Sequence, residues 1–164
     1  MAELALTPSS GDRRCYDLDG VGTLRLGGWA SRWATAEAGE RKWGLARRGF
    51  WRSRVEATDA AGAVVGIYEG RSLKRGGTLR WDGGEYVLKP DSNSQERYAL
   101  LDGDRRLALL EGKGWGKRPV RVDLDDEATI DPGLLLFTAF VVRALAQDAS
   151  AAASGASAGA VDGS

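Results

Sequence analysis

Apolar and polar residues alternate in short runs as far as Leu124, and turn residues separate the runs. Val21–Leu26 reads Val-Gly-Thr-Leu-Arg-Leu, and Val55 and Ala57 share a face with Trp51 and Ser53 in an extended segment. The other runs are Ala63–Tyr68, Thr78–Trp81, Glu85–Leu88, Arg97–Leu101, Arg105–Leu110 and Val120–Leu124. A period of two, with Gly- and Asp-rich turns at short intervals, predicts a mainly β protein with about ten strands.

The pattern changes after Ile130. Asp131 is a good N-cap and Pro132 a good first helical residue, and from Leu134 to Val142 only Thr138 is polar. A helix that is apolar on every side must lie inside protein or a membrane. Its apolar stretch spans about 20 Å, whereas a bilayer core is about 30 Å thick. We therefore expect a closed antiparallel barrel of about ten to twelve strands around this helix, with a tail anchor as the alternative.

The same pattern suggests the domain boundaries. With 164 residues the chain is long enough for one domain with a substantial core. We expect an N-terminal extension at 1–11 and a barrel domain at 12–148, with its central helix at about 132–148. The Ala-, Ser- and Gly-rich stretch at 149–164 offers little to bury, so we expect a disordered tail there.

Composition excludes several kinds of chemistry. The chain has no histidine and one cysteine, Cys15, so it has no Ser-His-Asp triad, no Cys-His pair and no His- or Cys₄-ligated zinc site. Lys plus Arg and Asp plus Glu number 23 each, and this zero net charge does not favour a nucleic-acid partner. No cofactor motif is evident. The N-terminus lacks an apolar signal-like region, so a cytoplasmic location is expected.

Two segments combine cations with aromatic residues or glycines, a composition that suits an anionic surface. Arg41–Val55 contains no acid, and its candidate ligand-binding residues are Arg47, Arg48, Arg52 and Arg54. Glu111–Val122 contributes Lys113, Lys117, Arg118 and Arg121. The second segment is not a Walker A loop, because Glu111 and Arg118 occupy positions that require Gly and Ser or Thr. The structural alternatives are a solvated hairpin for the first segment and an ordinary connection for the second.

The acidic run that begins at Asp123 resembles a calcium-binding loop at first sight. If Asp123 were its first position, Ala128 would replace the required Gly and Leu134 the required Glu. We therefore predict no metal site. Acids just before a helix favour its N-terminus, which is a sufficient reason for the run.

A β meander with Asp-x-x-Gly turns that ends in a hydrophobic helix resembles the tubby-like barrel superfamily, which includes LURP-one-related proteins and phospholipid scramblases. The resemblance covers about Asp12 to Gln147 and lies in architecture and rhythm, so no residue roles are carried over. It implies a twelve-stranded barrel around the helix, contact with anionic phospholipid headgroups and no catalysis. We expect a binding or interaction domain that is peripheral at a membrane. The alternative is an enzyme that uses carboxylates with Arg or Lys in a pocket at the barrel rim.

Overall fold

The structure, a computed structural model, describes residues 2–27, 32–48, 54–70, 76–91, 97–112, 120–125 and 129–162. For the helix it describes side chains as far as Asp148 and the backbone alone beyond that residue. All structural statements below concern these residues.

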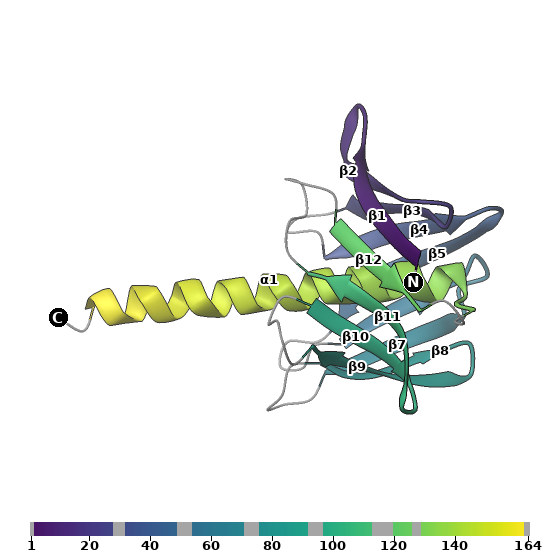
Figure 1. The fold of residues 1–164 in the computed structure, drawn as a ribbon. Helices are drawn as coiled ribbons and strands as arrows, with labels where there is room; N and C mark the ends of the chain where they lie inside the picture. The colour runs from purple at the N-terminus through teal and green to yellow at the C-terminus, as the bar shows by residue number, and fades with distance from the viewer. Residues whose placement is uncertain are drawn as a thin grey trace.

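Twelve antiparallel strands form one closed barrel, and each strand pairs with its neighbours in sequence (Figure 1). The strands are β1 (Ala2–Ser9), β2 (Asp12–Leu18), β3 (Gly22–Gly27), β4 (Trp33–Ala38), β5 (Arg41–Arg48), β6 (Arg54–Thr58), β7 (Val64–Gly70), β8 (Gly77–Trp81), β9 (Gly84–Pro90), β10 (Arg97–Asp102), β11 (Arg105–Glu111) and β12 (Val120–Leu124). Pairing of β1 with β12 closes the ring. The prediction of a mainly β closed barrel is confirmed, with the strand number at the upper end of the expected range.

The helix α1 (Pro132–Asp162) runs through the barrel along its axis (Figure 1). Small barrels of about eight strands are filled by their own side chains, and the diameter grows with strand number. A twelve-stranded barrel therefore has room for a helix about 10 Å across. We call the two ends of the barrel the helix-start end, where Pro132 lies, and the helix-exit end, where α1 emerges beyond Asp148.

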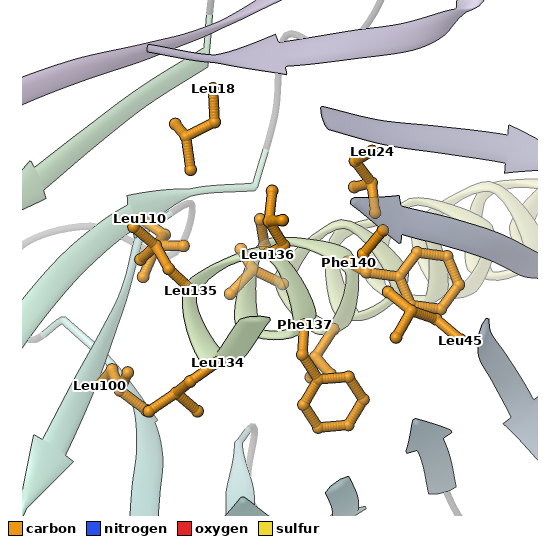
Figure 2. Packing of buried hydrophobic residues seen from close by; sticks show 14 of the residues in the cluster. Leu18, Leu24, Leu45, Leu100, Leu110, Leu134, Leu135, Leu136, Phe137 and Phe140 are labelled. Carbon is orange, nitrogen blue, oxygen red and sulfur yellow. The ribbon is translucent and has the colours of Figure 1, made fainter. Parts of the chain in front are cut away.

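The core lies between the helix and the inward faces of the strands. Figure 2 shows Leu134, Leu135, Leu136, Phe137 and Phe140 pointing outward from α1 towards leucines of the surrounding wall. Each of these five side chains is at most 2 % exposed. The strands alternate buried and exposed residues, as in β4 and β12, so one side chain in two faces the helix.

The helix start follows the sequence prediction closely. Asp131 caps the helix, because its Oδ1 accepts a hydrogen bond from the Gly133 N–H at 2.8 Å and its carbonyl accepts one from Leu135 at 3.1 Å. Thr138 is fully buried, and its hydroxyl donates to the Leu134 carbonyl at 2.7 Å. The single polar side chain in the apolar stretch is therefore satisfied within the helix.

The predicted domain boundaries differ from the structure at both ends. Residues 2–9 of the expected N-terminal extension form β1, a full strand of the barrel wall that pairs with β2 and β12. Leu6 of β1 is fully buried, which explains why this segment belongs to the barrel. The backbone of α1 continues to Asp162, where a disordered tail was expected from about residue 149. Alanine is the strongest helix former, so this Ala-rich composition is compatible with a helical backbone there.

Candidate functional site

The described candidate cations of both basic segments lie at or near the helix-exit end. In an up-and-down barrel alternate connections lie at the same end, so β5 ends and β6 begins where β11 ends and β12 begins. These two strand pairs nevertheless lie on opposite sides, because β6 and β12 are six positions apart in the ring of twelve strands. The helix leaves the barrel at this end (Figure 1). Of the eight candidate residues, Arg47, Arg48, Arg54 and Arg121 can be placed, whereas Arg52, Lys113, Lys117 and Arg118 lie outside the described residues.

Arg47 points into the barrel and contacts the helix. Its Nη2 lies 2.7 Å from Oδ1 and 2.8 Å from Oδ2 of Asp148. The Arg47 side chain is only 20 % exposed. The Arg47 guanidinium points inward and is already paired, so it is poorly placed to contact an external surface. We therefore assign Arg47 a structural role.

Polar side chains lie in and around the helix just inside the helix-exit end of the barrel. Burial raises the pKa of the Tyr68 hydroxyl well above its ordinary range, and the nearby Tyr98 and Asp148 add to the effect. Burial also lowers the pKa of Arg143, which the charge of Arg47 reinforces and Tyr16 opposes. The barrel interior is therefore apolar around Phe137 and polar where α1 leaves it.

Arg48 and Arg54 lie on the outer wall and share carboxylate partners. Arg54 contacts Glu56 at 3.1 Å and Glu69 at 2.9 Å, while Arg48 reaches Glu56 only at 3.8 Å. Glu69 belongs to the neighbouring strand β7. These two arginines and two glutamates balance one another in charge. An excess of positive charge on this side of the wall therefore requires a further cation.

That cation is Arg32, which the sequence analysis did not single out. Arg32 is exposed and its carbonyl accepts the Arg47 N–H at 2.9 Å, so it lies beside the end of β5. Within the described residues it forms no ion pair. Next to it, Trp33 is 51 % exposed on the outer wall. We call Arg32, Trp33, Arg48 and Arg54 the Trp33 corner.

Trp33 has a defined place on the wall. It pairs across β4 and β5 with Ala46, and its indole covers Gly27 of β3. A Cβ at Gly27 would lie 2.2 Å from the Trp33 ring, so glycine at this position lets the indole lie flat against β3. A large aromatic side chain is thus held half in solvent on the outer wall, with Arg32 next to it in the chain and Arg48 on the neighbouring strand β5.

Arg121 lies on the opposite side, on the outer face of β12. Its guanidinium contacts Glu3 of β1 at 3.1 Å, and its backbone N–H donates to Glu111 Oε2 at 3.3 Å. The two glutamates therefore offset the positive charge of Arg121. The other candidate cations of this segment, Lys113, Lys117 and Arg118, lie outside the described residues.

Metal ligands, membrane-spanning helices and likeness to known proteins each bear on function. Within the described residues, Asp, Glu and Cys side chains form no group of three that could hold a metal ion. No helix in the described part of the chain combines the length and apolar character needed to cross a membrane. The chain matches no known protein family, no curated protein and no solved structure.

Proposed function

We propose that this protein is a non-catalytic binding domain that contacts anionic phospholipid headgroups through the Trp33 corner. The observation that carries the proposal is the half-exposed Trp33 on the outer wall at the helix-exit end, with Arg32 next to it in the chain and Arg48 on the neighbouring strand β5. Tryptophan is enriched where proteins meet the interface between lipid and water, since its ring is apolar and its N–H is polar. The twelve strands around a central helix also accord with the tubby-like resemblance, which supports a lipid ligand.

The projecting helix limits how a membrane can approach. The backbone of α1 extends beyond the barrel at the helix-exit end (Figure 1). While it projects in this way, a flat surface cannot rest on the whole rim, so contact on one side is favoured. The Trp33 corner supplies an aromatic anchor on its side of the rim.

The expected binding is weak and sensitive to salt. Each Arg near an anionic surface contributes about 1 kcal/mol. Glu56 and Glu69 offset part of this contribution by pairing with Arg54. The Debye length falls from about 10 Å at about 0.1 M salt to about 3 Å at about 1 M, so binding should be lost over that range.

The test is co-sedimentation with vesicles that contain phosphatidylserine, compared with neutral phosphatidylcholine vesicles. The wild type should bind the anionic vesicles at low salt and release them at high salt. Trp33→Ala combined with Arg32→Ala should weaken binding by about tenfold or more, which corresponds to about 1.4 kcal/mol. Val64→Ala is a matched control, because Val64 is also 51 % exposed but lies at the helix-start end.

A second variant separates the two basic segments. Lys113→Ala, Lys117→Ala and Arg118→Ala together remove three cations of the segment Glu111–Val122. If this triple variant loses binding while the Trp33 variant retains it, the lipid function belongs to that segment and the Trp33 corner is wrong. If the wild type ignores anionic vesicles at low salt, the lipid function itself is wrong.

A further inference from the structure

Charge is separated along the axis of the barrel, although the chain as a whole has no net charge. Each hairpin turn at the helix-start end contains one acid and no Lys or Arg, and these acidic turns are residues 19–21, 39–40, 59–63, 82–83 and 103–104. Three of them line a pocket of about 410 Å³ together with Arg41 and Lys42. These two cations pair with Asp131 and Glu37, each at 3.0 Å, so their charges are already offset.

The helix-exit end has the opposite character. Arg13 and Arg14 follow the β1–β2 turn, Arg32 precedes β4 and Lys89 lies near the end of β9. All four side chains are exposed, and none of them forms an ion pair within the described residues. Their positive charges are therefore available to an external anion.

Most of the acids on the barrel wall at this end contact arginines, and they are Asp12, Glu56, Glu69 and Glu111. Asp91, which follows β9, forms no ion pair within the described part of the chain. Cations without an acidic partner thus outnumber acids without a cationic partner among the described residues of this end. Its surface is positive, whereas the acidic turns make the other end negative.

The two ends are far enough apart to act independently at ordinary salt. The strands contain five to eight residues, and at about 3.3 Å per residue with a tilt of about 40° this separates the ends by roughly 13–20 Å. The Debye length is about 10 Å at about 0.1 M salt. A charged surface at one end of the barrel therefore responds to the charges of that end and not to the net charge of the chain.

From this polarity we infer that the barrel meets an anionic lipid surface in one orientation, with its helix-exit end towards the lipid and its acidic turns away from it. The inference rests on the proposed lipid function, and it extends the contact surface from the Trp33 corner to the β1–β2 hairpin. Because β2, β3 and β4 are consecutive in the ring, Arg13 and Arg14 lie on the same side of the rim as Trp33. Figure 1 shows this hairpin projecting away from the rest of the barrel. The reverse orientation would bring the acidic turns against like charge.

Two pairs of arginines provide a matched test, because each pair follows a hairpin turn and is exposed. Arg13 and Arg14 lie at the helix-exit end, whereas Arg105 and Arg106 lie at the helix-start end. Replacing either pair with glutamine lowers the net charge of the chain equally. The readout is co-sedimentation of the full chain with phosphatidylserine vesicles at about 0.1 M salt, where the two ends act independently. We expect Arg13→Gln with Arg14→Gln to weaken binding about tenfold or more, and Arg105→Gln with Arg106→Gln to change it by less than about twofold.

A second measurement reads the orientation directly. After Cys15→Ser removes the native thiol, Ser10→Cys and Ala61→Cys each place one bimane label in an exposed turn. Position 10 lies at the helix-exit end and position 61 at the helix-start end. The quencher is phosphatidylcholine with a nitroxide on its headgroup, mixed into the phosphatidylserine vesicles. We expect strong quenching of the label at position 10 and little quenching at position 61.

Three results would overturn the inference while leaving the lipid function standing. Equal weakening by the two arginine pairs would show that net charge governs binding. Unchanged binding after loss of Arg13 and Arg14 would remove the β1–β2 hairpin from the contact. Equal quenching at positions 10 and 61 would show that the bound barrel has no fixed orientation. If the wild type does not bind phosphatidylserine vesicles at low salt, the lipid function and the inference both fail.

Discussion

Arg47 of β5 and Asp148 of α1 form a two-point contact across the interior of the barrel, with both Asp148 oxygens within 2.8 Å of the same Arg47 nitrogen. The contact lies at the level where the apolar packing of the helix gives way to the polar layer around Tyr68 and Arg143. It joins the last described side chain of the helix to the wall, so it fixes where α1 leaves the barrel.

Replacing Asp148 with Asn should lower the free energy of unfolding by about 1–2 kcal/mol, because the mostly buried Arg47 guanidinium loses a charged acceptor. Urea denaturation measures the change. Glu37→Gln is the control, since the Glu37–Lys42 pair lies on the surface, where an ion pair contributes about 0.5 kcal/mol or less. Equal losses in the two variants would show that Arg47–Asp148 behaves as an ordinary surface pair.

Phe137→Ala should lower the free energy of unfolding by about 3–5 kcal/mol, because Phe137 is fully buried against the wall and against Trp81. Chemical denaturation monitored by tryptophan fluorescence measures the loss. Val64→Ala removes apolar atoms from a half-exposed position and should change stability by less than about 0.5 kcal/mol. A cost near zero for Phe137→Ala would place that face of the helix outside the core.

Deleting 149–164 should leave the melting temperature unchanged, because α1 has left the barrel beyond Asp148 (Figure 1). Deleting the chain from Asp131 onward should prevent folding, because the barrel would lose the helix that fills it. Circular dichroism during heating measures both. A cooperative transition in the longer deletion would show that the barrel can close without its helix.

The stability difference between wild type and Asp131→Asn should depend on pH. Burial by itself raises the pKa of Asp131, but hydrogen bonds from Arg41 and Gly133 outweigh it and hold the pKa below its ordinary value. The Trp81 indole adds a weaker attraction, since its Nε1 completes no hydrogen bond within the described residues. The ionised carboxylate is therefore favoured in the folded state over the unfolded state.

A lowered pKa in the folded state means that the stabilisation is present above the ordinary pKa of about 4 and is lost as the pH falls through the folded value. Wild type should exceed Asp131→Asn in stability at pH 7, and the difference should shrink below about pH 4. Urea denaturation over this range measures it, with Asp104→Asn as an exposed control. A difference that stays constant down to pH 2 would contradict the role of Asp131 ionisation.

The central architecture could be predicted because the apolar stretch Leu134–Val142 has no solvent face and is too short for a bilayer. Four strands, β1, β2, β4 and β5, were not among the predicted runs, and for two of them the physical reason is clear. β4 turns three alanines inward, Ala34, Ala36 and Ala38, and alanine is a poor strand former that gives weak alternation. Small residues belong there because α1 packs closely on β3 and β4. β1 contains Pro8 and only one β-branched residue, Thr7, so its sequence did not predict a strand.

The surface sites were harder to predict. The sequence did not single out Arg32 and Trp33. Their place at the rim depends on pairing with the end of β5, which the sequence of their own segment does not reveal. The pocket at the helix-start end is lined by three turns whose proximity depends on strand order. Conversely, Arg47, Arg54 and Arg121 appeared available in the sequence, but their carboxylate partners lie on other strands or on the helix.

The order of elements along the chain has a kinetic consequence. All twelve strands precede α1, yet α1 supplies the centre of the core. During synthesis all twelve strands leave the ribosome before the helix that they enclose. The ring can close only when β12 is available to pair with β1. Pairing of segments so distant in sequence is slow, and unpaired strand edges are prone to aggregation meanwhile. The complete core of this domain can therefore form only after its helix has been synthesised.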